Sequence, residues 1–145
     1  MTYQWTTHSP EETIALARKL GERLHPGDCI AYRGDLGAGK TTFTRGIALG
    51  MGLGDCVTSP TFALVHDYAG KLLHFDMYRI MDENELETTG FYDYPQEECV
   101  FAVEWSENID AALPENTMRL TLERTGDEDR RITLEGDERF ADIGT

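Results

Sequence analysis

Apolar residues along this chain recur at two spacings, and the change from one to the other divides the sequence into short elements. Segments that alternate apolar and polar residues, or that form short apolar runs, are typical of strands, whereas apolar residues three or four positions apart are typical of helices. The strands expected on this basis are residues 3–7, 28–34, 61–68, 71–79, 99–105, 117–126 and 130–136. The expected helices are residues 9–24, 41–52 and 81–90.

The order of these elements predicts an α/β fold with a mixed sheet and flanking helices. Residues 99–105 (CVFAVEW) are almost continuously apolar, so we expect a strand buried at the centre of the sheet. Residues 117–126 and 130–136 alternate, as the strands of a half-exposed antiparallel hairpin do. Residues 1–145 contain no repeat or linker, so we expect a single domain with a loosely held tail from about residue 135.

The charge balance limits the partners that the chain can bind directly. It has 13 basic and 27 acidic residues in 145, which gives a net charge of −14. Such a surface repels the phosphate backbone of nucleic acids, so tight unaided binding of tRNA or DNA is disfavoured. An acidic surface is most simply a solvated one, and a basic protein partner is the more specific interpretation.

The cysteines and the N-terminal residues indicate a reducing compartment. Cys29, Cys56 and Cys99 lie far apart, without the spacing of a zinc site or a disulfide framework, and we expect Cys29 and Cys99 to be buried thiols. The first residues lack a basic segment followed by an apolar one, and no apolar run approaches the ~20 residues of a membrane span. A cytoplasmic location is the expectation.

The segment RGDLGAGKTT, residues 33–42, joins an expected strand to an expected helix. Gly34, Gly39, Lys40 and Thr41 satisfy the pattern G-x-x-x-x-G-K-[ST]. Backbone N–H groups can surround a polyphosphate only where no side chain blocks them, and the helix start adds further N–H groups. The lysine can then reach the β and γ phosphates, and the threonine hydroxyl can bind Mg²⁺. The context of strand and helix predicts a P-loop NTPase-like domain.

Two acidic residues that come later in the sequence than this loop each end the apolar run of an expected strand. Asp76 ends the run LLHFD and Glu104 ends the run VFAVE. Carboxyl ends of parallel strands meet at one edge of a sheet, so both acids could face the phosphates, where Mg²⁺ needs an oxygen ligand. Either residue alone would fit an ordinary surface acid, and the pattern does not decide which of the two binds the metal.

Four blocks together carry a family resemblance. GDLGAGKTTFTRG, SPTFALVHDY, HFDMYR and VEWSE, in this order and spacing, resemble the TsaE (YjeE) family of bacterial P-loop ATPases. The resemblance extends from about residue 5 to about residue 134 and leaves the tail unmatched.

The resemblance implies a role in tRNA modification. Proteins of this family work with TsaB and TsaD to make N6-threonylcarbamoyladenosine at position 37 of tRNAs. TsaE binds the TsaB–TsaD pair, its Mg²⁺-dependent ATP hydrolysis supports repeated turnover, and TsaD performs the transfer. The resemblance also implies low hydrolysis without the partners, and contact with tRNA only through the complex.

The resemblance assigns roles residue by residue. It implies that Lys40, Asp76 and Glu104 are catalytic, that Thr41 and Glu104 bind Mg²⁺, and that Trp105 matches the family's tryptophan after the acid. The residues implied to bind ATP are Ser9, Asp35, Gly37, Ala38, Gly39, Lys40, Thr41, Thr42, Thr61 and Gly126. Ser9 and Gly126 match regions that approach the adenine. Thr61 falls in a segment that resembles a nucleotide switch, although residues 58–61 alone would fit an ordinary polar turn.

Three other functions fit a P-loop. A small-molecule kinase is the main alternative, but the chain has little length for a lid and few arginines to enclose two substrates. A GTPase is disfavoured because the guanine-reading N-K-x-D segment does not occur in the sequence. A nucleotide sensor without activity stays open and is distinguished by measuring hydrolysis with and without the partner.

Overall fold

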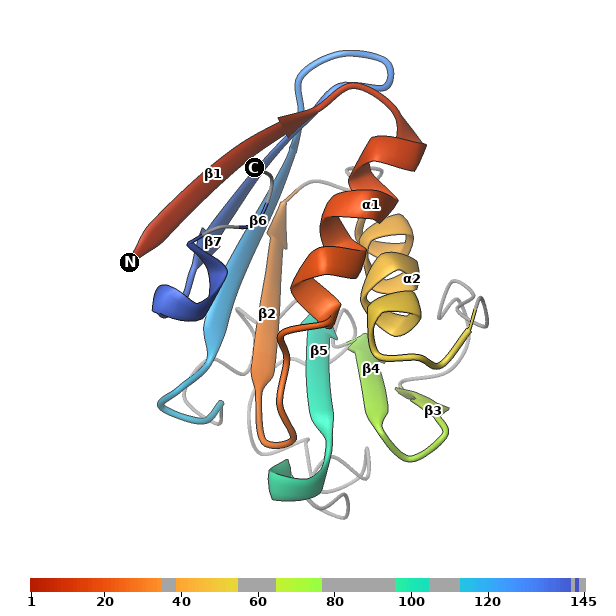
Figure 1. Cartoon of the computed structure of the whole chain (residues 1–145), viewed down its shortest axis with the longest axis vertical. Helices are drawn as coiled ribbons and strands as arrows, with labels where there is room; N and C mark the ends of the chain where they lie inside the picture. The colour runs from red at the N-terminus through yellow and green to blue at the C-terminus, as the bar shows by residue number, and fades with distance from the viewer. Residues whose placement is uncertain (35–38, 55–64, 77–95, 105–112, 142, 144–145) are drawn as a thin grey trace.

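A computed structural model describes residues 1–34, 39–54, 65–76, 96–104, 113–141 and 143 (Figure 1). Within these residues the chain forms a seven-stranded sheet and two α-helices. The strands are β1 (Thr2–Thr7), β2 (Cys29–Gly34), β3 (Val65–Tyr68), β4 (Leu72–Asp76), β5 (Val100–Glu104), β6 (Met118–Arg124) and β7 (Arg130–Glu135). The helices are α1 (Pro10–Gly21) and α2 (Lys40–Gly50), and two short 3₁₀ turns are η3 (Gln96–Glu98) and η5 (Glu138–Phe140). The expected helix over residues 81–90 lies outside the described residues.

The sheet is mixed, as the sequence predicts, and its order is β1-β7-β6-β2-β5-β4-β3. β2 runs parallel to both β5 and β6, and β4 runs parallel to β5. The other neighbours, β1–β7, β6–β7 and β3–β4, are antiparallel. The expectation of a central strand over residues 99–105 is confirmed, because β5 lies between β2 and β4 and is buried up to Val103. The carboxyl ends of β2, β4 and β5 therefore lie at one edge.

Both helices cover the same face of the sheet (Figure 1). Leu20 of α1 and Phe43 and Ile47 of α2 are fully buried in one core with Tyr32 and Leu120 of the sheet. Burial of large apolar side chains contributes roughly 1.5–3 kcal/mol each, so this layer provides much of the free energy that orders the sheet.

Helix α1 begins where its sequence predicts. The Ser9 hydroxyl accepts a hydrogen bond from the Glu12 backbone N–H at 3.1 Å, and Pro10 occupies the first helical position. The helix ends at Gly21, earlier than the expected residue 24. After Gly21 the backbone tightens into i→i+3 turns, in which the N–H groups of Arg23 and Leu24 donate to the carbonyls of Leu20 and Gly21.

A second, smaller core lies on the other side of the central strands. It consists of Cys29, Leu73, Phe75, Cys99, Phe101 and Val103. Phe75 and Phe101 contact each other with ring centroids 5.1 Å apart. Cys29 and Cys99 are free thiols buried there, which confirms their expected state. Burial raises the pKa of Cys29 to about 11, so this thiol stays protonated and unreactive at neutral pH. Cys56 lies outside the described residues.

The segment after β7 differs from the expectation of a loosely held tail. Phe140 is fully buried, and the Trp5 indole N–H donates to the carbonyl of Ile143 at 3.0 Å. Arg139 donates to both carboxylate oxygens of Asp28, at 2.8 and 3.1 Å, and so ties η5 to the start of β2. The aromatic side chain and the guanidinium supply the burial and the ion pair that hold this segment.

Among the described residues, neither helix is long and apolar enough to cross a membrane.

Candidate functional site

The end of the glycine-rich loop meets the first turn of α2 at Gly39. Gly39 has φ +101°, a conformation that costs a residue with a side chain about 1–2 kcal/mol. A Cβ there would meet its nearest neighbour, Nε of Arg130, only at 3.8 Å, so the backbone conformation rather than a lack of space favours glycine. Lys40 follows as the first helical residue and is 8% exposed. The first N–H groups of a helix have no acceptor within it, which makes this turn a candidate site for an anion.

Gly34, the first glycine of the motif, has a different reason to be glycine. It has φ +130° at the end of β2, and a Cβ on it would lie 2.1 Å from the carbonyl oxygen of Leu122 on β6. The absent side chain lets two parallel strands approach where the loop begins. We expected the glycines of the motif to leave the backbone N–H groups accessible to phosphate. At Gly34 the structure shows another reason for glycine, the close packing of β2 against β6.

A small cavity lies beside the start of α2. Its volume is about 40 Å³, and it is lined by Pro10, Thr13, Gly39, Thr42, Glu128 and Arg130. The lining comes from the start of α1, the start of α2 and the β6–β7 turn. The structure thus brings the regions around the predicted Ser9 and Gly126 to the same end of the molecule as the loop, although these two residues do not line the cavity.

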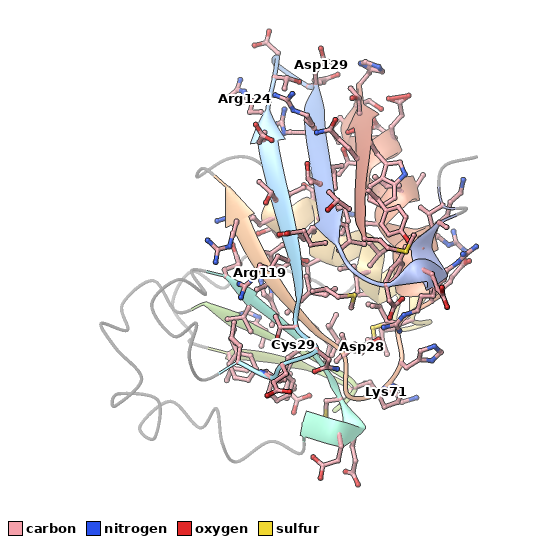
Figure 2. The ribbon with its side chains drawn as sticks, turned by 90° about the vertical axis from the view of Figure 1, so that its left-hand side faces the viewer. Asp28, Cys29, Lys71, Arg119, Arg124 and Asp129 are labelled. Atoms are coloured by element: carbon pink, nitrogen blue, oxygen red, sulfur yellow. The ribbon has the colours of Figure 1, made fainter. Side chains whose placement is uncertain are left out.

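The β6–β7 turn is shaped by Arg130, which the sequence analysis missed. Nη1 of Arg130 donates to the carbonyl oxygens of Gly126, Asp127 and Asp129 at 3.3, 3.4 and 2.9 Å. Nδ1 of His8 lies 3.2 Å from Oδ1 of Asp129 and so connects the end of β1 to this turn. Figure 2 shows Asp129 and Arg124 together at this end of the sheet. The Arg130 contacts are local to the turn, whereas the contact of His8 with Asp129 joins residues that are 121 positions apart in the sequence, so no local pattern predicts it.

The two predicted acids lie at the edge of the sheet where β2 leads into the loop. Asp76 and Glu104 are paired in register at the ends of the parallel strands β4 and β5, and β5 is the direct neighbour of β2. The Glu104 side chain is 12% exposed. The side chain of Asp76 lies outside the described part of the chain, so the structure does not decide which acid faces a metal.

A buried histidine contacts Glu104, and the sequence analysis gave it no role. The side chain of His74 has no exposed surface, and its Nε2 lies 2.6 Å from Oε2 of Glu104. The signal was present in the sequence, because His74 is a polar residue inside the apolar run of β4. A polar group at such a position needs a partner.

Buried hydroxyl groups connect the sheet to the first turn of α2. Thr44 Oγ1 lies 2.9 Å from the carbonyl oxygen of Lys40 and donates to it. Since its hydrogen is used there, the Tyr32 hydroxyl is the donor in the 2.7 Å contact between Tyr32 and Thr44. Burial, and to a lesser degree the nearby charge of Glu104, raises the pKa of the Tyr32 hydroxyl above its ordinary value. Tyr32 therefore remains a neutral donor beneath the loop.

The described donors fit a magnesium–nucleotide complex. Thr41, in the first turn of α2, offers a hydroxyl and Glu104 a carboxylate, the oxygen ligands that Mg²⁺ prefers. Among the described residues, no cluster of three or more His, Cys, Asp or Glu side chains gathers into a metal cage. A magnesium ion bound with few carboxylates normally completes its shell with phosphate and water oxygens.

Several predicted site residues cannot be placed. Asp35, Gly37 and Ala38 of the loop, Thr61 of the switch-like segment and Trp105 after β5 all lie outside the described residues. Of the predicted residues, the described structure brings Gly39, Lys40, Thr41 and Thr42 together in one turn, at the sheet edge that bears Asp76 and Glu104.

Comparison with known proteins gives consistent matches in sequence and in structure. The family model described as "Threonylcarbamoyl adenosine biosynthesis protein TsaE" matches residues 7–132. The tRNA threonylcarbamoyladenosine biosynthesis protein TsaE of Bacillus subtilis (strain 168) is 41% identical over 134 residues, which cover 90% of this chain and 84% of that protein. The protein of the same name from Haemophilus influenzae is 40% identical over 139 residues, covering 89% of this chain and 87% of that protein. The crystal structure of Bacillus subtilis YdiB superposes with a TM-score of 0.74 at 34% identity, covering 99% of this chain and 91% of that one.

Proposed function

This chain belongs to the TsaE family of threonylcarbamoyl adenosine biosynthesis proteins, and on that basis we propose that it is a Mg²⁺-dependent ATPase. It binds a TsaB–TsaD pair and supports repeated threonylcarbamoyl transfer to adenosine 37 of tRNAs. The observation that carries the proposal is the convergence at one sheet edge of a helix start with a buried lysine and two strand-end acids, Asp76 and Glu104.

Each residue of this edge has a role in the proposed reaction. Lys40 contacts the β and γ phosphates, and the N–H groups after Gly39 bind the remaining phosphate oxygens. Thr41 and Glu104 hold Mg²⁺, and Asp76 orders the attacking water or the metal shell. When bound, Mg²⁺ supplies positive charge that offsets the charge of the phosphates. Positioning and electrostatic stabilisation account for most catalysis of phosphoryl transfer, so these residues suffice for slow hydrolysis.

The acidic surface supports an indirect role with respect to tRNA. A net charge of −14 opposes contact with the phosphate backbone, so the partner proteins hold the tRNA. Binding of ATP orders residues 58–62 and the surface that faces the partners, and hydrolysis releases them, as in other nucleotide switches. Those residues lie outside the described part of the chain, so this step stands on the family resemblance.

A multiple-turnover assay of tRNA modification with TsaB and TsaD tests the proposal. We expect many cycles when the protein is present, and about one cycle or fewer when it is omitted or replaced by the Lys40→Ala variant. The same reactions, followed for ATP consumption, show whether the partners stimulate hydrolysis. Equal numbers of cycles with and without the protein would refute the proposed role even if ATP binding is intact.

Two binding experiments refine the roles of the metal and the base. Nucleotide binding with and without Mg²⁺ should depend on Glu104 more than on Asp76, because β5 lies next to β2 and β4 does not. A complex with Mg²⁺ and ATP in which Asp76 is the direct ligand would reverse this assignment.

In competition, ATP should displace a bound analogue better than GTP, since the guanine-reading segment is missing. Equal displacement by ATP and GTP would mean that the protein does not distinguish adenine from guanine.

A further inference from the structure

His74 lies directly behind the proposed metal ligand, and the proposed reaction gives it no task. It stands in β4 among the fully buried residues Leu72, Leu73 and Phe75, and it is itself fully buried. A polar group buried without a partner costs free energy, so a histidine kept there needs a reason. Its Nε2 lies 2.6 Å from Oε2 of Glu104 on the neighbouring strand.

The strand register explains how the two side chains meet. In the parallel pairing of β4 and β5, His74 is opposite Ala102, and Glu104 lies two residues beyond Ala102 on β5. Residues two apart in a strand share a face, and Ala102 belongs to the core on the helix-covered face. The small side chain of Ala102 leaves room for the imidazole to reach along β5 to the carboxylate at its end.

The distance between Nε2 of His74 and Oε2 of Glu104 is that of a hydrogen bond, but the two groups are not aligned as in one. Among the described residues, neither ring nitrogen of His74 has a well-aligned partner. The last torsion of a glutamate side chain is soft, so a small rotation aligns the carboxylate, whereas a buried N–H left unpaired costs about 1–3 kcal/mol. The paired arrangement has the lower free energy, with Nε2–H as donor and Oε2 of Glu104 as acceptor.

The imidazole is held in place from the helix side. The ring of Tyr32 packs against it edge to face, with centroids 6.2 Å apart and planes at 66°. The Tyr32 hydroxyl in turn donates to Thr44, which donates to the carbonyl of Lys40. A donor whose own support is fixed in this way sets the orientation of the group it contacts.

We infer that His74 is a positioning residue for Glu104. Its Nε2–H holds one carboxylate oxygen and thereby presents the other oxygen to the metal of a Mg²⁺–nucleotide complex. This inference rests on the proposed function, because it takes Glu104 as the metal ligand. Residues that orient a metal ligand from behind typically change metal affinity 10–100-fold when removed.

The test measures nucleotide affinity with Mg²⁺ and with EDTA, using a fluorescent ATP analogue, and takes the ratio as the contribution of the metal. His74→Leu, which keeps the volume but removes the donor, should lower this ratio about tenfold or more and leave the EDTA affinity unchanged. His74→Gln keeps a donor near the place of Nε2 and should restore most of the ratio. His74→Asn places its amide nearer to Nδ1 and should resemble the leucine variant. The Asn and Gln pair replaces the leucine variant if the latter does not fold.

His66 provides the matched control, because it is the register partner of His74 on β3 and is only partly buried. His66→Leu should keep the wild-type ratio. In a Glu104→Ala background, His74→Leu should have no further effect on the ratio. The inference would be overturned, while the proposed function stands, if the folded His74 variants keep the wild-type ratio. It would also be overturned if His74→Leu lowers the ratio as much in the Glu104→Ala background as in the wild type. A wild-type protein with no metal-dependent gain in affinity would instead overturn the metal site on which both depend.

Discussion

Two carboxylates at opposite ends of the sheet, that of buried Asp28 and that of partly buried Glu104, have different kinds of partner. At the end that carries Asp28 and Lys71 (Figure 2), the guanidinium of Arg139 contacts both oxygens of Asp28, and the backbone N–H of His25 donates to one of them. At the loop end, the contact that the structure describes for Glu104 is with an imidazole, at one oxygen. A guanidinium is always charged and cancels the charge of its partner, whereas an imidazole can donate without carrying charge.

Under the proposed function, this difference separates a carboxylate that stabilises the fold from a carboxylate that binds a ligand. Arg139 also donates to Asp137 and to the carbonyl of Arg23, and Arg23 donates back to the carbonyl of Arg139. Contacts within the chain therefore satisfy that cluster. At the loop end, a positive-φ glycine, a buried lysine and a strand-end acid lie at the same edge, which is the arrangement that we propose binds phosphate and Mg²⁺. We expect mutations at the two ends to affect different properties.

The largest effect is expected for Lys40→Ala. Loss of a charged hydrogen bond to phosphate should cost about 1.5–3 kcal/mol, which is about 10- to 100-fold or more in ATP affinity. Titration with a fluorescent ATP analogue measures it. Lys71→Ala is the matched control, since this exposed lysine lies at the other end of the sheet (Figure 2). Equal affinity in the wild type and the Lys40 variant would remove the phosphate-binding assignment.

Arg139→Leu should affect stability and leave ATP binding unchanged. It leaves Asp28, whose side chain is 8% exposed, without its charged partner, so the free energy of unfolding should fall by about 1–3 kcal/mol. Urea unfolding measures this loss. Arg131→Leu is the control, because its 3.4 Å pair with Glu123 is exposed on the sheet surface and should contribute less than about 1 kcal/mol. Weaker ATP binding in a folded Arg139 variant would contradict the separation of the two ends.

Gly39→Ala and Gly52→Ala separate backbone strain from phosphate binding. Both glycines have positive φ, at +101° and +80°, and a Cβ would meet no close neighbour at either position. Each substitution should therefore lower the free energy of unfolding by about 1–2 kcal/mol. Only Gly39→Ala should also weaken ATP binding, because its Cβ stands at the loop. Parallel melting and titration measurements decide this, and equal ATP affinity in both variants would exclude Gly39 from the phosphate site.

The smallest effect is expected for Asp137→Asn, and it depends on pH. The hydrogen bond from Arg139 lowers the pKa of the Asp137 carboxyl below its ordinary value of 3.8. A group with a lowered folded-state pKa stabilises the protein above the unfolded-state value and loses that contribution as the pH falls through the folded-state pKa. The melting temperature of the wild type should therefore exceed that of the variant at neutral pH, and the gap should close below about pH 3.8. A gap that stays constant down to pH 2 would contradict the assigned contact.

Local patterns predicted most of the fold because each element has a strong signal. The apolar runs before Gly34 and Glu104 marked the central strands, and Ser9-Pro10 marked the start of α1. The tail was predicted wrongly because its stability comes from contacts distant in sequence, those of Arg139 with Asp28 and of Phe140 with the core. A short polar segment with one aromatic residue gives no sign of such contacts by its own composition.

The site was predictable to the extent that it lies in motifs. The loop motif located Lys40 and Thr41 at a helix start, and strand ends located Asp76 and Glu104 at the same sheet edge. The partners in the contacts around the site were not predictable, because Glu104 meets His74 from the neighbouring strand and Asp129 meets His8 from a turn far along the chain. Whether the loop, switch and tryptophan positions act as the family resemblance implies stays a prediction.

The pairing of β1 with β7 has a consequence for folding during synthesis. Thr2 is paired with Glu135, and the N–H of Gly136 donates to the carbonyl of Met1 at 2.9 Å. β1 leaves the ribosome before β7 and therefore cannot pair in the sheet until the residues of β7 have emerged. Until then β1 presents an unpaired edge with Tyr3 and Trp5, which is a template for wrong association. A nascent chain that stops before Arg130 has the complete glycine-rich loop in its sequence but lacks the strand that joins β1 to β6.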